Sequence, residues 1–302
     1  MSGSTSPKLS VIVCSLNGER VLPACLSSLS ASEGIDFEII VIDNGSSDST
    51  PELVRRDFPN ARLIQTGSNL GFAGGNNVGM QAARGEIFLL LNDDTEVPPD
   101  CLAKLCATFD ADPKIGAAGC KLFYPDRKTI QHAGGVIFAN GNTGHIGARE
   151  PDTGQWDEPG ERDYVTGAAL ALRRAALEEV GLLDPGFFPI YFEETDLQRR
   201  LARAGWRIWY EPRAWLVHHE SQTQGVGSPK FIYNYTKNRL RFVALNGVPF
   251  GKKAAFRAEL KWLIQFVGEG RAVPILRAYW HGLKNWHAWR ADRKTRASVP
   301  KL

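Results

Sequence analysis

Short apolar runs alternate with helical patterns through the first third of the chain. The first of these runs is rich in β-branched residues, and the runs have the length of buried strands. Four strands are expected, at residues 9–16, 37–43, 61–66 and 86–92. Helical spacing of apolar residues follows the first three, at residues 19–29, 50–58 and 76–85. The alternation predicts a doubly wound α/β sheet.

The details of two of these helices can also be predicted. Thr50 is a candidate N-cap, with Pro51 at the first helical position, and Gly85 is expected to close the helix that begins at Asn76. After residue 98 the pattern loosens. Helices are expected at 99–109 and 195–205, strands at 115–123, 136–140 and 206–212, and a strand that runs into a helix at 164–181. Residues 140–163, rich in Gly, Asp, Pro and Glu, are expected to form a mobile loop.

Length and composition narrow the class of protein. A chain of 302 residues that is 43% hydrophobic fits one large globular domain, with or without an extension. Its five cysteines form no CxxC pair and no zinc-binding spacing, so reduced thiols in a reducing compartment are expected. The start, "MSGSTSPKLS", has no apolar signal region, and no apolar run approaches the ~18 residues that span a bilayer. We therefore expect a soluble or peripheral protein.

Polar clusters follow three of the predicted strands. They are Ser15–Asn17, Asp43–Asp48 and Asn92–Thr95. Each cluster alone is typical of turn or cap residues. In a doubly wound sheet, however, ligands bind beyond the carboxyl ends of the strands. Three polar clusters at one edge of the sheet therefore predict a binding site there.

The adjacent acids Asp93 and Asp94 at the tip of the fourth strand indicate what is bound. Like charges repel and resist desolvation, so water or a cation must accompany them. Mg²⁺ and Mn²⁺ prefer oxygen ligands, usually carboxylates together with phosphate oxygens. A nucleotide diphosphate is the simplest source of those phosphates. The chain has no GxxxxGK[ST] loop and no GxGxxG after the first strand, which argues against P-loop and dinucleotide-binding folds.

Four segments in consistent order carry a family resemblance. They are "VIVCSLNGE" (11–19), "VIDNGSSDST" (41–50), "NLGFAGGNNVGMQAARGEIFLLLNDDTEV" (69–97) and "FFPIYFEETDLQRRLARAGWRIWYEPRAWLVHH" (187–219). Together they resemble a family 2 glycosyltransferase with a GT-A fold, in the rhamnosyltransferase-like branch that builds bacterial surface polysaccharides. The resemblance implies a glycosyltransferase domain at 1–245, with a nucleotide-sugar half at 8–97 and an acceptor half at 98–245. Residues 246–302 would form a basic helical extension.

The resemblance implies a donor site at the strand ends. Asp43 would accept hydrogen bonds from the base or ribose, and Asp94, the last acid of a DXD-type motif, would bind Mg²⁺ or Mn²⁺. His218 is implied as a second metal or phosphate contact by its distance from Thr223. The residues implied in nucleotide-sugar binding are Ser15, Asn17, Glu19, Asp43, Asn44, Gly74, Asn77, Asn92 and Asp93.

The segment "YFEETDL" supplies candidates for the catalytic base. Acids in the first turn of a helix also have a structural explanation, because they favour the helix dipole by about 0.3–1 kcal/mol each. In the family the usual pair is Glu-Asp, and the second acid removes the proton from the acceptor hydroxyl. That position is Glu194 here, one methylene longer than Asp, so Asp196 and Glu193 stay as alternatives. A single displacement would invert the anomeric configuration.

Other segments match the family with less defined roles. Thr166 and Gly167 would lie beside the acceptor, or would belong to a plain buried strand. The "HAGG" segment at 132–135 fits the family without an assigned chemistry. Residues 237–239 would face a diphosphate or form a solvated surface.

The charge is unevenly spread along the chain. Residues 251–302 hold twelve Lys and Arg against three acids, a net charge of +9, so residues 1–250 carry −6 of the overall +3. Such a basic end favours an anionic partner. One stripe of the tail is apolar, and tryptophans follow it among basic residues; these residues are Phe256, Leu260, Leu263, Val267, Trp280, Trp286 and Trp289. Contact of residues 252–296 with a membrane surface is expected, with packing on the domain or a homo-oligomer contact as alternatives. Nucleic acid is not expected, because no binding motif accompanies the charge.

The expected activity is metal-dependent inverting glycosyl transfer. A hexose or deoxyhexose, such as rhamnose, would pass from a UDP-, dTDP- or GDP-sugar to a hydroxyl of a surface glycan or polyprenyl-diphosphate-linked glycan. The enzyme would be cytoplasmic, and peripheral at the inner face of the cell membrane. A non-catalytic glycan-binding protein of the same fold is one alternative. A sugar nucleotidyltransferase is another, although "SLNGERVLPA" lacks its Gly-rich basic loop.

Overall fold

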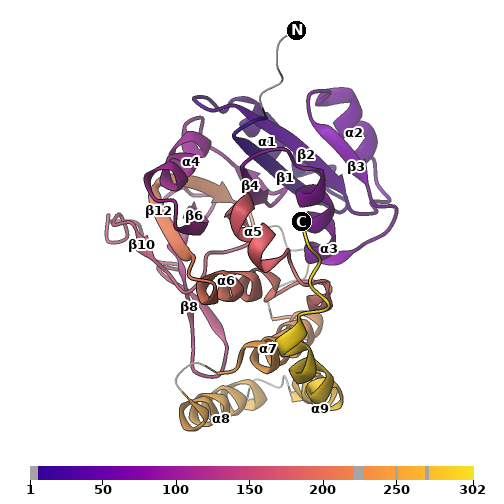
Figure 1. Ribbon diagram of the computed structural model, residues 1–302, viewed down its shortest axis with the longest axis vertical. Coiled ribbons are helices and arrows are strands. Elements are labelled where there is room, and N and C mark those ends of the chain that lie inside the picture. Colours follow the sequence, from indigo (N-terminus) through magenta and orange to yellow (C-terminus); the bar gives the residue numbers. More distant parts are fainter. Residues whose placement is uncertain (1–5, 221–226, 249–250, 269–271) are drawn as a thin grey trace.

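The computed structural model describes residues 6–220, 227–248, 251–268 and 272–302, without the side chains of 265–268 (Figure 1). A mixed sheet of ten strands forms its centre, in the order β10-β12-β6-β11-β4-β1-β2-β3, with β5 beside β12 and β7 beside β6. These strands are β1 (Leu9–Ser15), β2 (Phe37–Asp43), β3 (Arg62–Gln65), β4 (Ile87–Leu91), β5 (Thr95–Glu96), β6 (Ile115–Phe123), β7 (Ile130–His132), β10 (Gly160–Glu161), β11 (Ala169–Arg173) and β12 (Arg207–His218). A separate hairpin joins β8 (Gly135–Ile137) to β9 (Thr143–His145).

The first four strands form the predicted parallel half of the sheet. β1 lies between β2 and β4 and is parallel to both, with Ser15 beside Asp43 and Val13 beside Leu91. Their carboxyl ends therefore meet at one edge. β11 runs antiparallel between β4 and β6, which makes the sheet mixed. The predicted mixed α/β class is confirmed.

Helices cover both faces of this sheet. They are α1 (Leu22–Ser30), α2 (Thr50–Asp57), α3 (Gly71–Ala82), α4 (Cys101–Ala111), α5 (Arg174–Val180), α6 (Glu193–Arg203), α7 (Pro229–Asn246), α8 (Lys252–Gly268) and α9 (Ala272–Thr295), with a 3₁₀ turn at Pro185–Phe187. Side chains alternate between faces along a strand. Val11 and Leu89 thus pack with α1, α2 and α4, whereas Ile12 and Leu90 pack with α3, α5 and α6.

The structure corrects several predicted boundaries. α3 begins at Gly71, before the predicted Asn76, and ends at Ala82 because the backbone of Ala83 is extended. Gly85 is therefore not its cap. Thr50 is the first residue of α2 and Ser49 its N-cap.

The second half of the sheet is more regular than its sequence predicts. β9 and β10 both lie within residues 140–163, so this segment is not an unstructured loop. β12 continues six residues beyond the predicted end at Pro212, through a register shift between Glu211 and Trp215. This extension brings His218 beside β5, where it pairs with Thr95.

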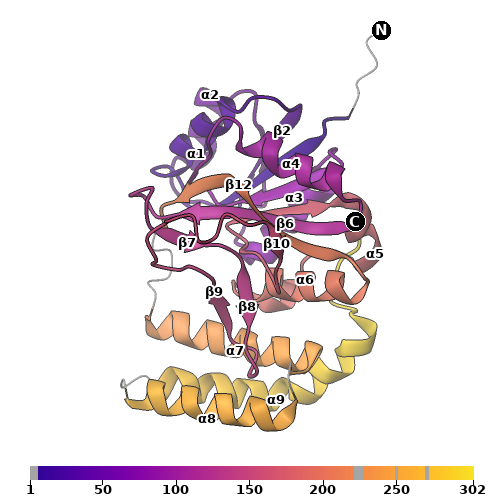
Figure 2. The same cartoon turned by 90° about the vertical axis from the view of Figure 1, so that its left-hand side faces the viewer.

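The C-terminal helices form a separate layer, as the predicted helical extension requires. α7 packs against α9, and Figure 2 shows α8 and α9 on the far side of α7 from the sheet. The last residues return to the region of α5, where the N–H of Leu182 donates to the carbonyl of Pro300 at 2.9 Å (Figure 1). Within the described residues, no helix is both long and apolar enough to cross a membrane.

The predicted apolar stripe of this layer needs correction. Phe256, Leu260 and Trp280 are exposed, but Leu263 is half-buried and Trp289 is buried. Trp289 lies in the helix layer, beneath Arg241 and beside His281. The predicted Val267 lies outside the described side chains, and Thr223, used to select His218, lies outside the described residues. All five cysteines are free, as expected.

Candidate active site

The loops after β1 and β2 are tied to each other. Asn17 accepts a hydrogen bond from the N–H of Ser47 at 2.8 Å and donates its own N–H to Oγ of Ser46 at 2.9 Å. Glu19 accepts from the N–H of Ser49 at 3.2 Å. These contacts fix the two loops as one wall beside the strand ends, and Asn17 and Glu19 belong to that wall.

The side chains of Asp43 and Asn44, at the end of β2, are buried and form several hydrogen bonds. Asp43 accepts from the N–H of Ser46 and from Nε2 of Gln65, each at 3.0 Å. Asn44 accepts from the N–H of Leu70 at 3.0 Å and donates to the carbonyl of Gly71 at 3.2 Å. The contacts of Asn44 position the start of α3 against the end of β2.

Two predicted nucleotide-binding residues lie within α3. A Cβ on Gly74 would stand 2.7 Å from Cβ of Leu70, so the close approach of that side chain requires glycine. The buried amide of Asn77 bonds both backbone atoms of Leu183, donating to the carbonyl at 2.9 Å and accepting from the N–H at 3.1 Å. Asn77 thus holds the loop after α5, and its contact with a nucleotide stays a prediction.

The end of β4 presents Asp93 toward β1. Its carboxylate accepts a hydrogen bond from Oγ of Ser15 at 2.5 Å. Burial, with a smaller contribution from the charge of Asp94, raises the pKa of Asp93 to about 6, and the hydrogen bond from Ser15 opposes this rise. Ser15 and Asp93, each predicted to bind the nucleotide sugar, are therefore in direct contact.

Asp94 lies beside the imidazole of His218, as the sequence implied for two metal contacts. Nε2 of His218 is 3.1 Å from Oδ1 of Asp94 and 3.2 Å from Nδ2 of Asn92. Nδ1 of His218 lies 2.6 Å from Oε1 of Gln131. An amide oxygen only accepts, so Nδ1 carries the proton of the neutral ring. The lone pair of Nε2 is then directed toward Asn92 and Asp94.

This arrangement suits a shared divalent cation. A carboxylate oxygen and an imidazole nitrogen are both ligands of divalent cations, so Asp94 and His218 could bind one cation together. No group of three or more His, Cys, Asp or Glu residues with metal-binding geometry occurs in the part of the chain that the structure describes. Two protein ligands leave positions for phosphate oxygens and water, as is usual for Mg²⁺.

His219 is committed to a different contact. It lies 2.7 Å from Glu96, which also binds Arg127 at 2.8 Å. The hydrogen bond from His219 lowers the pKa of Glu96. The side chain of His218 therefore contacts the Asp94 carboxylate, whereas His219 contacts Asp94 only through its backbone N–H, which donates to the carbonyl at 2.9 Å.

Glu193 and Glu194 are the first two residues of α6. Glu193 is 1% exposed and its Oε2 has no hydrogen-bond partner, and burial together with the charge of Glu194 raises its pKa well above the ordinary value. Glu194 is half-buried, and burial raises its pKa too. A Cβ on Gly167 would lie 3.5 Å from Cγ of Glu194 and 3.1 Å from the ring of Phe72. The structure thus brings Gly167 beside Glu194.

Asp196 faces away from Glu194 into an ion-pair network. It is fully buried and lies 3.0 Å from both Arg200 and Arg296, and Asn246 donates to it at 2.7 Å. Burial alone would raise its pKa, but the two arginines hold the pKa below its ordinary value. Asp196 therefore connects α6 to α7 and to the C-terminal segment.

Gln131 was missed from the sequence, and His132 was noted within the "HAGG" segment without an assigned role. Gln131 orients His218, as described above. His132 is fully buried, and burial lowers its pKa well below the ordinary value. Its Nε2 accepts from the N–H of Thr166 at 3.2 Å, and its Nδ1 lies 3.1 Å from Nδ1 of His145. The "HAGG" segment thus supports the Thr166 loop.

Residues 237–239 were expected either to face a diphosphate or to form a solvated surface. In the structure they contact other segments of the protein. Lys237 donates to the carbonyl of Phe188 at 2.6 Å, and Asn238 donates to that of Ile190 at 2.9 Å. Arg239 is buried and pairs with Glu259 at 2.7 Å. The prediction of a solvated surface is wrong for Asn238 and Arg239, because both hold neighbouring segments in place.

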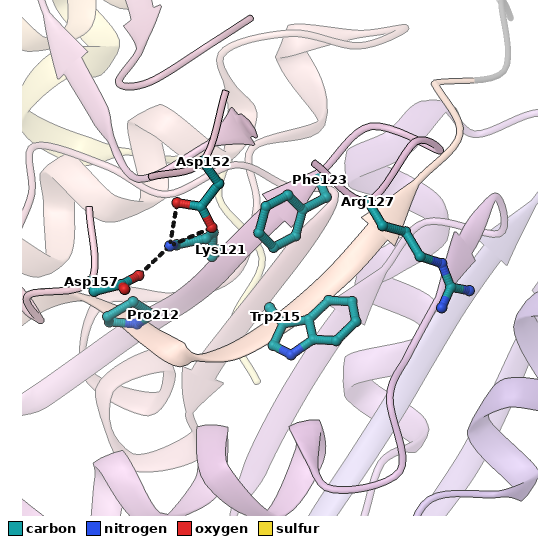
Figure 3. A pocket seen from close by; sticks show the side chains of 7 residues that line it. All are labelled: Lys121, Phe123, Arg127, Asp152, Asp157, Pro212 and Trp215. Atoms are coloured by element: carbon teal, nitrogen blue, oxygen red, sulfur yellow. Dashed lines mark hydrogen bonds and ion pairs between the residues drawn. The ribbon is translucent and has the colours of Figure 1, made fainter. Parts of the chain in front are cut away.

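A separate cavity of about 280 Å³ lies on β6 and β12 (Figure 3). Its lining residues are Lys121, Phe123, Arg127, Asp152, Asp157, Pro212 and Trp215. Lys121 lies between Asp152, at 3.2 Å, and Asp157, and the rings of Phe123 and Trp215 meet edge to face. None of the predicted donor, metal or base residues lines this cavity, so it is distinct from the candidate active site.

Comparison with protein families agrees with this geometry. The model for "Glycosyl transferase family 2" matches residues 10–181, which include β1 to β4 and both Asp93 and Asp94. The chain belongs to glycosyl transferase family 2. The predicted family and enzyme class, a glycosyltransferase, are thereby confirmed.

Two relatives show how the similarity extends along the chain. An N-acetylglucosaminyl-diphospho-decaprenol L-rhamnosyltransferase of Mycobacterium tuberculosis is 29% identical over 262 residues, covering 80% of this chain and 83% of the relative. The protein y4gI of Sinorhizobium fredii is 33% identical over 239 residues, covering 73% of this chain. The matched region spans only 25% of y4gI, so that protein is far longer.

A solved structure shows the same fold. The mannosyltransferase PcManGT of Pyrobaculum calidifontis, in complex with GDP-Man and Mn²⁺, superimposes with a TM-score of 0.59. The match covers 98% of this chain and 86% of that one, at 18% identity. At this identity the likeness shows the fold alone, and it confirms the predicted GT-A architecture.

Proposed function

We propose that this chain is a metal-dependent, inverting glycosyltransferase that moves a sugar from a nucleotide diphosphate to a glycan hydroxyl. One observation carries the proposal. The 3.1 Å contact of Asp94 with His218 lies at the strand edge where nucleotides bind in such sheets, in a chain that belongs to glycosyl transferase family 2. Glu194 would supply the base; it lies beside Gly167, and the next residue, Ala168, accepts a hydrogen bond from the N–H of Asn92 at the end of β4.

The donor would bind along the ends of β1, β2 and β4. Asp43 and Asn44, at the end of β2, would face the base and ribose, and Ser15 and Asp93 would lie beside the ribose and diphosphate. Asp94 and His218 would hold Mg²⁺ or Mn²⁺. When bound, the cation supplies charge neutralisation for the leaving nucleoside diphosphate.

Glu194 would act as the base on the acceptor side. Its pKa is raised by burial, which brings its basicity closer to what proton removal from a hydroxyl needs near neutral pH. Thr166 and Gly167 would border the acceptor, because Gly167 lies against Glu194. One displacement, with the hydroxyl attacking opposite the leaving group, inverts the anomeric configuration. The ion pairs of Asp196 with Arg200 and Arg296 favour Glu194 over Asp196 for this role.

The substrate class follows from similarity. The Mycobacterium tuberculosis relative bears a name that specifies L-rhamnose transfer to a lipid-diphosphate sugar. By analogy, we propose a deoxyhexose or hexose donor carried by UDP, dTDP or GDP, and a polyprenyl-diphosphate-linked or surface glycan acceptor. Such an acceptor places the reaction in the cytoplasm at the inner face of the cell membrane.

Calorimetry with UDP, dTDP and GDP, each with Mn²⁺ or with a chelator, tests the donor site. We expect one nucleotide to bind at least tenfold more tightly with Mn²⁺, because the cation joins the diphosphate to Asp94. Asp94→Asn should lose this metal dependence. Asp100→Asn removes an exposed acid six residues away and should leave it unchanged.

Transfer from the matching nucleotide sugar is then measured with the same variants. We expect Asp94→Asn to lower kcat/KM by about 100-fold or more, since it weakens stabilisation of the leaving group. Equal binding and transfer by wild type and Asp94→Asn, with and without chelator, would refute the metal site.

A further inference from the structure

We propose that α8 and α9 form a surface that binds the face of an anionic lipid bilayer. We call this the α8–α9 surface and define it by its exposed apolar and basic side chains. The apolar members are Phe256, Leu260, Ile264, Val273, Leu276, Trp280 and Leu283, and the basic members are Lys253, Arg257, Lys261, Arg277 and Lys284. It lies outside the candidate active site and binds without donor, acceptor or metal.

The outward side of α8 carries two parallel stripes. Phe256, Leu260 and Ile264 recur every four residues and are between 49% and 71% exposed. The basic stripe, Lys253, Arg257 and Lys261, has the same spacing, with each cation three positions before an apolar residue, and is also exposed. Residues four apart share one side of a helix. An apolar stripe in water therefore runs directly beside a cationic one.

The inward side of α8 is anchored, which fixes the orientation of those stripes. Glu259 pairs with the buried Arg239 of α7 at 2.7 Å, and the guanidinium of Arg239 lies 4.8 Å from the ring of Trp262. Glu259 also accepts a hydrogen bond from Asn140 at 3.0 Å. The exposed apolar side chains of α8 are thus not free to turn inward.

α9 repeats the pattern. Its buried residues Ile275, Ala278 and Gly282 face the protein, and Gly282 packs against Leu240 of α7. The opposite side carries Val273, Leu276, Trp280 and Leu283, each between 61% and 75% exposed. The cations lie at the edge of this stripe, and Nζ of Lys284 stands 3.4 Å from the centre of the Trp280 ring.

The exposed apolar side chains are concentrated in this one layer. Among the described residues, ten large apolar side chains are exposed, and seven of them belong to α8 and α9. Figures 1 and 2 both show these two helices at the same end of the molecule, with α7 between them and the sheet. A concentration of apolar surface on this scale marks an interaction site.

The positive charge of the α8–α9 surface favours a lipid bilayer over a second copy of the chain as its partner. Residues 251–302 carry a net charge of +9, so two such surfaces placed face to face would bring like charges together. An anionic membrane instead attracts the cations while its interior accepts the apolar stripes. Since no described helix can cross a membrane, the two helices would lie in the plane of the interface.

The membrane surface would complement the proposed function without depending on it. A lipid-linked acceptor presents its sugar close to the headgroups, and a surface that binds headgroups keeps the enzyme in the same layer. Vesicle binding is measured without donor or metal, so failure of the α8–α9 surface and failure of the proposed transferase activity are distinguishable.

Vesicle flotation with the full chain tests the proposal. One set of vesicles contains only phosphatidylcholine, and the other contains phosphatidylcholine with phosphatidylglycerol. We expect at least about tenfold stronger binding to the anionic vesicles, weakening as salt is raised. Equal binding to both sets, or binding to neither, would overturn the proposal.

Two variants separate the cationic and apolar contributions. The triple variant Lys253→Gln, Arg257→Gln, Lys261→Gln should lose at least about tenfold in binding to anionic vesicles. Its control removes three exposed cations from the sheet domain: Arg56→Gln, Lys114→Gln and Lys128→Gln. The control should bind anionic vesicles as wild type does. Equal losses of binding in the two triple variants would mean that only net charge matters. That result would overturn the assignment of binding to the α8–α9 surface.

The double variant Leu276→Gln, Leu283→Gln should also bind anionic vesicles about tenfold or more weakly. Phe138 is an exposed aromatic residue outside the α8–α9 surface, and Phe138→Gln should not weaken binding. All substituted side chains are exposed, and thermal unfolding checks that each variant folds. Sedimentation velocity is run on the same samples. A wild-type dimer that the double variant converts to a monomer, with no vesicle binding, would assign the surface to a second copy and overturn the proposal.

Discussion

Two pairs of adjacent acids are held by different elements, and their surroundings differ. Asp93 and Asp94 end β4, where Ser15 donates to one and His218 lies against the other. Glu193 and Glu194 begin α6, where burial raises both pKa values. In the sequence the two pairs look alike.

The difference shows that the surroundings of a carboxylate decide its chemistry. A carboxylate beside an imidazole lone pair suits a cation whose other coordination positions stay open for further ligands. The bound cation keeps the carboxylate charged. A buried acid with a raised pKa suits proton transfer. Asp196, two residues beyond Glu194, shows a third outcome, because arginines on both sides commit it to structure.

The largest expected effect concerns Glu194. Glu194→Gln should lower kcat by about 10³-fold, because a neutral amide cannot accept the acceptor's proton. Nucleotide and metal binding, measured by calorimetry, should be unchanged. Initial rates of transfer, measured between pH 5 and 9, should fall in wild type as pH falls through the raised pKa of Glu194, since the base must be deprotonated.

Glu193→Gln is the matched control for that experiment. Burial and the charge of Glu194 raise the pKa of Glu193, which favours its neutral form, so replacing it with an amide of the same shape should change kcat far less. Equal losses in the two variants would contradict the assignment of Glu194 as the base. A larger loss in Glu193→Gln would transfer the role to Glu193.

A smaller effect, on stability and not on chemistry, is expected at Asp196. Asp196→Asn should lower the free energy of unfolding by about 3 kcal/mol, because the buried Arg200 is left without its carboxylate partner. Urea unfolding at pH 7 measures the change. The folded variant should keep most of its kcat; a loss of about 10³-fold with unchanged stability would show that Asp196, and not Glu194, is the base.

The smallest effect concerns the charge of Asp93. Its pKa is raised from 3.8 to about 6, so the folded protein binds this proton more tightly than the unfolded chain does. The free energy of unfolding therefore falls as pH rises through that window. Without metal, Asp93→Asn should stabilise the protein by about 1–2 kcal/mol at pH 7.5, and by nothing near pH 4.

Thermal unfolding of wild type and Asp93→Asn at several pH values measures this difference. A stabilisation that is the same at pH 4 and pH 7.5 would show that charge is not its cause. Ser15→Ala is a useful comparison, because it removes the hydrogen bond that opposes the rise in pKa and should destabilise the protein at pH 7.5.

The sequence by itself determined the parallel half of the fold and the acids at its edge. β1, β2 and β4 are short apolar runs whose β-branched residues favour strands, and Asp93 and Asp94 follow β4 directly. Those signals are local, because each lies within a few consecutive residues. The start of α3 was missed since its first residues, near Gly71, are fixed by contacts with Asn44 and not by helical spacing.

Only the tertiary structure decided the partners of those acids. His218 reaches Asp94 because β12 continues past its bulge to lie beside β5, and Gln131 reaches His218 because β7 pairs with β6. Asp196 meets Arg296 across 100 residues of chain, and Trp289 is buried although it resembles the exposed Trp280 in sequence. Such contacts depend on which strands and helices become neighbours, and the spacing of residues along a single segment carries no information about that.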